Sequence, residues 1–385
     1  MQLLRNPNVR PNLPDATPLN GVGFERAIDL HRAIAGYEPT ALVSLPGLAG
    51  RLGVGRVLVK YELERFGLPA FKILGASWAT YRLLSQRYEQ QHGHPPEATT
   101  FEGVREAFRD LGPVTLTTAT DGNHGRAVAR AAKWFGLGAD IYMPAGTVPA
   151  RVTAIESEGA RVTVIDGDYD EAVELAASTA NDDRLVVSDT SWPGYEQVPR
   201  WTSEGYLTLF AEIDEQLGSG APDAFVVPVG VGGLAQAALD HWPSGPPDGP
   251  VRIAVEPTAA DCLYRSLVAG EMVSVPGPHD SIMAGMNCGT LSMVAWPAMR
   301  DRFDWCVTIE NDAAADAMRA LAAEGLVVGE TGAASVGALL ALAAEQGDLA
   351  GLGLGAGATV VCVCTEGATD PVNYEAIVGK APSEV

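Results

Sequence analysis

Short apolar runs alternate with longer helical patterns along most of the chain, and this alternation constrains the fold more than any other feature. Apolar runs of strand length indicate strands that are buried on both faces, as in parallel sheets flanked by helices. The expected strands are Val57–Tyr61, Val114–Thr118, Ala139–Met143, Arg161–Ile165, Leu185–Ser188, Ala224–Val229, Arg252–Val255, Trp305–Ile309 and Thr359–Thr365. The expected helices are Gly75–Tyr88, Gly125–Phe135, Ala150–Glu158, Tyr169–Asn181, Gly233–His241, Asp312–Glu324 and Thr331–Ala344. The sequence therefore predicts an α/β fold with mostly parallel sheets.

Composition narrows the class of protein. The chain has 385 residues, of which 47% are apolar, enough to fill the cores of two lobes. Its 26 lysines and arginines face 48 aspartates and glutamates, for a net charge of −22. A surface this acidic repels phosphate backbones and anionic lipid, so we expect no nucleic-acid or membrane partner. No apolar run is long enough for a bilayer, and the N-terminal stretch lacks an apolar signal core, so a cytoplasmic location is expected.

The cysteines agree with that location. Five cysteines, an odd number in a long chain, fit a reduced cytosolic protein better than a disulfide scaffold. Cys262 and Cys288 are far apart in sequence, so the sequence leaves open whether they pair. No cluster of histidines and cysteines has metal-ligand spacing, and we predict no metal site.

Lys72 is the first candidate for chemistry. It stands in the run FKILG at positions 71–75, among apolar and small neighbours. A charged amine is costly to keep in such surroundings, so Lys72 is a candidate nucleophile. An amine of this kind can form a Schiff base with an aldehyde cofactor. The alternative is a lysine that starts a helix and extends its ammonium group into water.

A polar turn with the sequence TTATDGNHG covers positions 117–125, between an expected strand and an expected helix. Such a turn points backbone N–H groups at one spot and favours an anion there, such as a substrate carboxylate. Asn123 offers an amide donor to a phenolate-type oxygen, and Asp121 is placed to move a proton. The alternative is an ordinary turn in which His124 merely begins the helix.

A glycine-rich loop, GVGGLA at positions 230–235, follows another expected strand and opens a helix. Glycines permit close backbone approach, and a helix N-terminus carries partial positive charge, so this loop is a candidate phosphate site. The same string satisfies a loose dinucleotide fingerprint, with Glu256 near the position of a ribose-binding acid. A nicotinamide cofactor is therefore the competing interpretation, although it gives Lys72 and Asp121 no role.

Two further polar residues stand where expected strands end. Thr365 closes the last strong strand, where a hydroxyl can hydrogen-bond a ring nitrogen without protonating it. Asp189 follows an earlier strand, at the edge where α/β proteins build their sites. A polar turn for Thr365 and a helix cap or solvated loop for Asp189 are the alternatives.

Taken together, these motifs make the chain similar to the diaminopropionate ammonia-lyase family. That family belongs to the fold-type II pyridoxal-phosphate (PLP) enzymes, with threonine dehydratase and the tryptophan synthase β-subunit. The matching stretches are collinear over about residues 40 to 378: 65–72 (RFGLPAFK), 120–125 (TDGNHG), 141–144 (IYMP), 188–192 (SDTSW), 255–257 (VEP), 260–262 (ADC), 329–332 (GETG) and 365–370 (TEGATD).

The resemblance implies a two-lobed tryptophan synthase β-like fold and a role for each motif. The large PLP-binding domain would comprise 1–77 plus 204–385, and the small inserted domain 78–203. Lys72 would hold the cofactor and take the Cα proton of an L-substrate, Asp121 would be the base for a D-substrate, and Asp189 would lie near the leaving amino group. The residues expected to bind the cofactor are Phe71, Lys72, Asn123, Gly230, Val231, Gly232, Gly233, Leu234, Glu256 and Thr365. Those expected to bind the substrate are Thr120, Asp121, Gly122, His124 and Asp189.

The resemblance also implies the reaction. The chain would eliminate the β-amino group of 2,3-diaminopropionate to give pyruvate and ammonia, as a PLP-dependent carbon–nitrogen lyase and a homodimer. One alternative keeps PLP but changes the reaction to β-replacement or to dehydration of a hydroxy amino acid such as serine or threonine. A second is an NAD-dependent oxidoreductase built on residues 230–235. A minor option is a non-catalytic, regulatory relative of these enzymes, and the presence of Lys72 argues against it.

Overall fold

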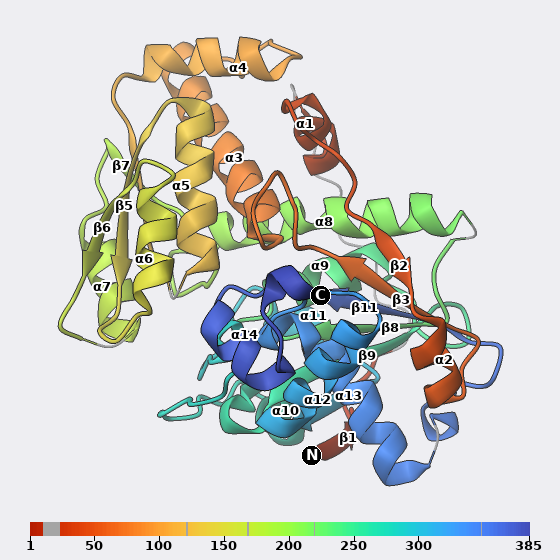
Figure 1. The fold of residues 1–385 in the computed structure, drawn as a ribbon. Helices are drawn as coiled ribbons and strands as arrows, with labels where there is room; N and C mark the ends of the chain where they lie inside the picture. Colours follow the sequence, from red (N-terminus) through yellow and green to blue (C-terminus); the bar gives the residue numbers. More distant parts are fainter. Residues whose placement is uncertain (11–23, 121, 168, 219, 348) are drawn as a thin grey trace. The chain divides into compact units, whose positions relative to one another are not determined.

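The computed structural model describes residues 1–10, 24–120, 122–167, 169–218, 220–347 and 349–385. The chain forms two compact units (Figure 1). Unit 1 comprises Met1–Ala16, Pro39–Ala70 and Leu209–Val385, and unit 2 comprises Thr17–Glu38 and Phe71–Thr208. Within the described ranges, no helix combines the length and the apolar character needed to cross a membrane.

Unit 1 contains a seven-stranded sheet whose central strands are parallel. Its strands are β1 (Gln2–Arg5), β2 (Leu42–Ser44), β3 (Arg56–Tyr61), β8 (Ala224–Pro228), β9 (Val251–Pro257), β10 (Trp305–Ile309) and β11 (Thr359–Cys364), in the order β1-β10-β9-β8-β11-β3-β2. The two edge strands, β1 and β2, run antiparallel to their neighbours. Strands β8 and β9 are buried along their whole length, which explains their near-continuous apolar sequences.

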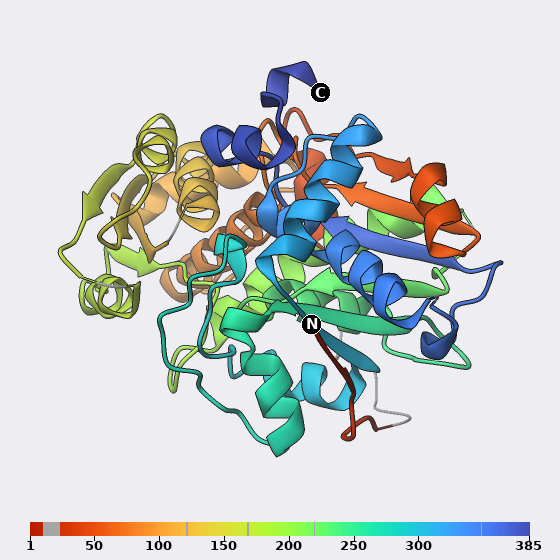
Figure 2. The same cartoon turned by 60° about the horizontal axis from the view of Figure 1, so that its bottom comes forward.

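Helices cover both faces of this sheet. They are α2 (Pro46–Leu52), α9 (Gly233–His241), α10 (Cys262–Ala269), α11 (Trp296–Arg302), α12 (Asn311–Ala323), α13 (Glu330–Gln346) and α14 (Pro371–Val378). Helix α13 packs against β8, β9, β10 and β11, and α12 lies beside it (Figure 2). A Cβ atom on Gly337 would stand 2.9 Å from the Ala313 carbonyl oxygen, so the small residues of α13 allow α12 to approach closely.

Unit 2 contains a four-stranded, all-parallel sheet. Its strands are β4 (Thr115–Ala119), β5 (Gly138–Met143), β6 (Arg161–Val164) and β7 (Arg184–Val186), in the order β6-β5-β4-β7. Its helices are α1 (Ala27–Ala33), α3 (Lys72–His92), α4 (Phe101–Ala107), α5 (Asn123–Phe135), α6 (Pro149–Glu156) and α7 (Tyr169–Ser178). Helix α5 places an apolar stripe against β4 and β5, formed by Ala127, Val128, Ala131, Ala132 and Phe135.

The chain passes from unit 2 to unit 1 within α8 (Gln197–Leu217). The predicted strands are confirmed to within two residues at each end, and the predicted helices to within four. Sequence patterns did not predict α8, the short edge strands β1 and β2, or the helices α1, α2, α4, α10, α11 and α14. Pro199 lies in the first turn of α8, where proline is tolerated because that N–H has no helical partner.

Candidate active site

The predicted site residues form one group in each unit. In unit 2, Phe71 and Lys72 stand at the start of α3, the turn after β4 carries Thr120 to His124, and Asp189 follows β7. Asp121 lies outside the described residues. Because β4 and β7 are adjacent and parallel, the segments that follow them emerge at the same edge of the sheet.

The turn after β4 is closed by Thr120. Its hydroxyl oxygen accepts hydrogen bonds from Gly122 N at 2.9 Å and from Gly125 N at 3.0 Å. A Cβ atom on Gly125 would stand 2.3 Å from Thr120 Cγ2, so this position needs glycine. The predicted substrate-binding residue Thr120 therefore uses its hydroxyl to shape the turn that starts α5 with Asn123 and His124.

Lys72, Asp189 and His124 meet in unit 2. The Lys72 ammonium donates to Asp189 Oδ2 at 2.5 Å, and the two side chains are 24% and 11% exposed. His124 Nε2 lies 2.8 Å from the Val187 carbonyl oxygen, a contact in which the ring N–H donates. His124 Nδ1 is 3.7 Å from the same Asp189 oxygen and has no hydrogen-bond partner among the described residues. The lysine thus lies beside a carboxylate that itself faces a buried imidazole.

Burial and charge fix the protonation of this cluster. Burial lowers the pKa of His124; Asp189 opposes that shift and Lys72 adds to it, so the imidazole is neutral near pH 7. Burial would raise the pKa of Asp189, but His124 and Lys72 together lower it below its ordinary value. Of these two neighbours, only the Lys72 ammonium also donates a hydrogen bond to the Asp189 carboxylate.

In unit 1 the second group lies at the ends of three adjacent parallel strands. Strand β11 pairs with β3 on one side and with β8 on the other. The segment with Arg65 follows β3, Thr365 follows β11, and the glycine-rich loop follows β8. The carboxyl edge of this part of the sheet therefore gathers all three segments.

The glycine-rich loop has the geometry of an anion cradle. Gly232 has φ +106°, a conformation that side chains disfavour, and directly precedes α9. A Cβ atom on Gly230 would stand 2.9 Å from the Gly285 carbonyl oxygen, and one on Gly232 would stand 2.6 Å from Met299 Cε. The loop therefore presents bare backbone at a helix N-terminus, the arrangement that binds phosphate.

Thr365 offers a complementary contact. It is 4% exposed, and its hydroxyl has no hydrogen-bond partner among the described residues. A buried hydroxyl without a partner costs free energy, so a partner supplied by a ligand would repay that cost. The chemistry of these residues fits PLP, since unit 1 offers bare backbone to a phosphate at Gly230–Leu234 and a buried hydroxyl at Thr365, and unit 2 offers an amine at Lys72.

The segment that leads to Lys72 is held in unit 1 by its backbone. Gly367 N donates to the Pro69 carbonyl oxygen at 3.0 Å, and Ala70 pairs with Glu366 in an antiparallel bridge. Thr365 immediately precedes this contact, so the turn after β11 and the segment before Lys72 share one backbone anchor. Earlier in the segment, Phe66 has φ +55°, the single positive φ outside glycine in the described chain.

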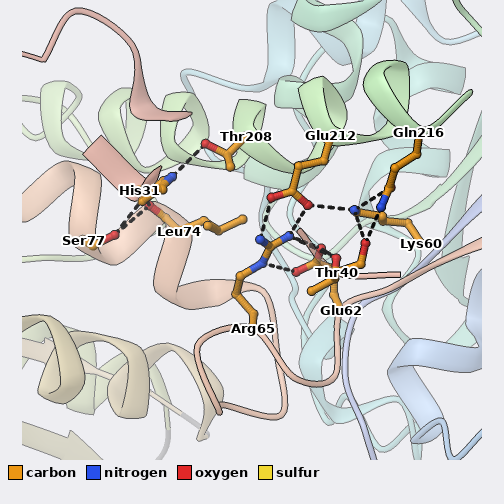
Figure 3. A network of polar contacts seen from close by, with 10 residues as sticks. All are labelled: His31, Thr40, Lys60, Glu62, Arg65, Leu74, Ser77, Thr208, Glu212 and Gln216. Atoms are coloured by element: carbon orange, nitrogen blue, oxygen red, sulfur yellow. Dashed lines mark hydrogen bonds and ion pairs between the residues drawn. The ribbon is translucent and has the colours of Figure 1, made fainter. Parts of the chain in front are cut away.

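Buried charges hold the same segment at Arg65 (Figure 3). Arg65 donates to Glu62 at 2.6 and 3.0 Å and to Glu212 of α8 at 2.6 and 2.7 Å. Lys60 donates to Glu212 at 2.7 Å, to the Thr40 carbonyl oxygen at 2.7 Å and to Gln216 at 3.0 Å. We call these residues the Arg65 network: Thr40, Lys60, Glu62, Arg65, Glu212 and Gln216. Its four charged side chains are 0% exposed and their charges cancel, which is the condition for burying ions without a large penalty.

Glu256, a predicted cofactor-binding residue, makes its hydrogen bonds to the start of α10. Its carboxylate is fully buried and accepts hydrogen bonds from Leu263 N at 2.7 Å and Tyr264 N at 2.8 Å, which caps α10. Burial raises the pKa of Glu256 to about 8, although the two hydrogen bonds act to lower it. Both oxygens are thus committed to the protein backbone, which leaves no exposed carboxylate for a cofactor or a ribose. All five cysteines are thiols, so Cys262 and Cys288 form no disulfide here.

Comparisons with known proteins agree with this geometry. A family model described as pyridoxal-phosphate dependent enzyme matches residues 34–366. Together with the architecture, this match defines the class as PLP-dependent enzymes of fold type II. The dinucleotide interpretation of the glycine-rich loop is therefore wrong.

Individual relatives narrow the class. The chain is 38% identical to diaminopropionate ammonia-lyase of Escherichia coli strain K12 over 364 residues, covering 91% of this chain and 90% of that protein. The crystal structure of the E. coli enzyme in complex with D-serine has a TM-score of 0.87 at 35% identity, and covers 98% of this chain and 96% of its own. The same enzyme in complex with an aminoacrylate-PLP azomethine reaction intermediate has a TM-score of 0.85 at 34% identity, with the same coverage. Within its class, the chain belongs to the diaminopropionate ammonia-lyase family, which confirms the resemblance drawn from its motifs.

Proposed function

We propose that this chain is a PLP-dependent ammonia-lyase that removes the β-amino group of 2,3-diaminopropionate. One substrate and one water give one pyruvate and two molecules of ammonia. The relatives that cover nearly the whole chain carry this activity in their names, and the fold is theirs. Lys72 would hold the cofactor, Gly230–Leu234 its phosphate, Asn123 its phenolic oxygen and Thr365 its ring nitrogen.

The observation that supports this proposal most is the environment of Lys72. The chain has four lysines, Lys60, Lys72, Lys133 and Lys380. Lys60 is fully buried with three acceptors, whereas Lys133 and Lys380 lie on the exposed surface. Lys72 alone combines partial burial with a carboxylate at 2.5 Å and about a quarter of its side chain exposed. An amine in this setting is reachable by a ligand and has a nearby group to exchange protons with.

PLP, when bound, withdraws electrons from the substrate carbon that bears the α-amino group and so makes its proton acidic. The protein's own side chains do the rest. The Lys72 amine takes the Cα proton of the L-isomer, and Asp189 keeps the departing β-amino group protonated, because an amine leaves more readily as ammonia than as an amide anion. His124, neutral and fixed by its bond to Val187, lies beside Asp189, with Nδ1 3.7 Å from the carboxylate.

For the D-isomer we propose a second base, Asp121, which stands between Thr120 and Gly122 in the sequence. Asp121→Asn should spare turnover of L-diaminopropionate and lower turnover of the D-isomer about 100-fold. Pyruvate release from each isomer is the measurement. Equal losses on both isomers would contradict the assignment of separate bases.

A substrate panel tests the function itself. Purified enzyme is incubated with L- and D-diaminopropionate, serine and threonine, and pyruvate or 2-oxobutyrate is measured. We expect the highest kcat/KM on diaminopropionate. Serine belongs in the panel because the E. coli relative was solved with D-serine, and dehydration of a hydroxy amino acid is the second candidate. A preference for serine or threonine would overturn the ammonia-lyase proposal and leave the fold and cofactor standing.

Two further assignments complete the proposal. We expect a homodimer, which light scattering would detect as twice the chain mass, and a cytoplasmic location, which the five thiols favour. A monomer by light scattering would contradict the first.

A further inference from the structure

Tyr206 of α8 is a buried tyrosine, and no hydrogen bond within the described residues explains why this position carries a hydroxyl group. The side chain is 1% exposed, and the hydroxyl has no hydrogen-bond partner among the described residues. Leaving a buried phenol unsatisfied costs free energy that a phenylalanine at the same position would avoid. A partner that arrives with a ligand would account for the tyrosine.

The ring of Tyr206 lies against the turn that carries Lys72. It packs edge-on to Phe71, with ring centroids 4.7 Å apart. A Cβ atom on Gly75 would stand 2.6 Å from Tyr206 Cε1 and 2.7 Å from Cζ, so the phenol fills the space of a side chain at position 75. Gly75 follows Lys72 by three residues and shares its face of α3. The Tyr206 ring therefore packs against the first turn of the helix that begins with Lys72.

The charges of the cluster reach this hydroxyl. Burial raises the pKa of Tyr206; Lys72 opposes that shift and Asp189 adds to it. The phenol is therefore protonated throughout the working pH range and can act as a hydrogen-bond donor.

The acceptor that would lose its strong donor while Lys72 holds the cofactor is Asp189. In this structure the Lys72 ammonium supplies its strong hydrogen bond, at 2.5 Å. With the Lys72 nitrogen bonded to the cofactor aldehyde, that ammonium would not be available, and a carboxylate that is only 11% exposed would gain from another donor. His124 has already given its N–H to the Val187 carbonyl oxygen, so Nδ1 carries no proton to donate.

We propose that Tyr206 is a positioning residue whose hydroxyl donates to the Asp189 carboxylate when Lys72 holds the cofactor. The inference rests on the proposed role of Lys72. By keeping Asp189 ionised and in place, Tyr206 acts on the substrate through Asp189 without touching the reacting atoms itself.

The test compares Tyr206→Phe with a matched control, Tyr374→Phe. Tyr374 of α14 is also fully buried, and its hydroxyl also lacks a partner among the described residues, but it belongs to the apolar core of unit 1. Both variants should unfold as apoproteins at the wild-type temperature or slightly above it, since each loses an unsatisfied hydroxyl.

The loaded proteins should differ. The Kd of PLP for the apoprotein, followed by its absorbance, should rise about tenfold in Tyr206→Phe, and kcat should fall on the order of 100-fold with a smaller change in KM. Tyr374→Phe should match the wild type in both. In an Asp189→Asn background, Tyr206→Phe should cause little further loss, because the acceptor is already altered.

The outcomes are distinct. Wild-type Kd and kcat in Tyr206→Phe would overturn the inference, and so would a lower unfolding temperature of its apoprotein, which would reveal a structural partner for the hydroxyl. A Lys72→Ala protein measured in parallel identifies failure of the underlying function. If it still bonded PLP covalently, the role of Lys72 itself would be wrong, whatever Tyr206 does.

Discussion

Lys60 and Lys72 are both withdrawn from solvent beside a carboxylate, yet their surroundings differ in completeness. Lys60 is 0% exposed, and its three donors are all taken, by Glu212, Gln216 and the Thr40 carbonyl oxygen. Lys72 is 24% exposed beside Asp189, and near it stand a ring nitrogen of His124 and the Tyr206 hydroxyl, neither hydrogen-bonded within the described chain. A saturated cluster can only hold structure, whereas an unsaturated one has capacity left for a ligand.

The Arg65 network and Lys72 are also connected along the chain. The Arg65 network fixes the segment that starts seven residues before Lys72, and the bonds from the turn after β11 fix Pro69 and Ala70. A rigid backbone before the lysine limits the positions that its amine can reach. Precise placement of a reacting group is a large part of catalysis, so we expect the Arg65 network to contribute to activity indirectly.

Removing the reactive amine should have the largest effect. Lys72→Ala should lose the PLP absorbance band at ~410–420 nm that an internal Schiff base gives, and activity should fall at least about 1000-fold. The exposed lysine of α5 provides the control, and Lys133→Ala should keep both the band and the rate. An unchanged band in Lys72→Ala would break the distinction between the two lysines.

Neutralising the shared anion of the Arg65 network should mainly affect stability. Glu212→Gln leaves Lys60 and Arg65 buried with Glu62 as the remaining carboxylate of the network, and should lower the free energy of unfolding by about 3 kcal/mol. Chemical denaturation measures this loss. Glu215→Gln, an exposed change on the same helix, should cost about 0.5 kcal/mol or less. Equal effects of the two variants would show that the network does not hold the segment.

The corresponding change beside Lys72 should have the opposite profile. Asp189→Asn should lower kcat about 100-fold, because the amide cannot supply the charge or the proton. Its free energy of unfolding should change by only about 1 kcal/mol, since the ion pair is partly exposed. Kinetics and denaturation on the same preparation give both values. A large loss of stability with kcat intact would reverse the roles assigned to the two clusters.

Acidification should gradually reduce the difference in free energy of unfolding between the wild type and Glu212→Gln, a smaller effect than those above. Burial would raise the pKa of Glu212, but Arg65 and Lys60 lower it below its ordinary 4.5. A carboxyl group with a depressed folded-state pKa stabilises the fold above its unfolded-state pKa, and this contribution disappears as pH falls through the folded-state value. The stability difference between the two proteins should therefore be constant from pH 8 to 5 and shrink below pH 4.5. A difference that grew on acidification would contradict the ion pairing.

Much of the fold could be predicted from the sequence because buried parallel strands leave a local signal. Strand β10 was predicted residue for residue, and Lys60 lies inside a correctly predicted strand. What Lys60 contacts could not be predicted, because Glu212 is 152 positions away and lies on α8, the longest element that the analysis missed. For the same reason Tyr206 was not recognised as part of the site.

Residues of the candidate site could be predicted where they directly follow a strand. Asp189 was identified by its position after β7, yet its pairing with Lys72 spans 117 positions and appears only in the folded chain. The local sequence around Lys72 suggested an apolar setting and gave no sign of that carboxylate. Glu256 was placed by its spacing from a glycine-rich loop, and the fold uses it to cap α10.

The central claim is that Lys72 alone among four lysines bonds the cofactor, and covalent trapping tests it most directly. The PLP-loaded protein is reduced with borohydride, digested and mapped by mass spectrometry. We expect one pyridoxyl adduct, on the peptide that contains Lys72, with Lys60, Lys133 and Lys380 unmodified. An adduct on any of those three, or no adduct at all, would contradict the account.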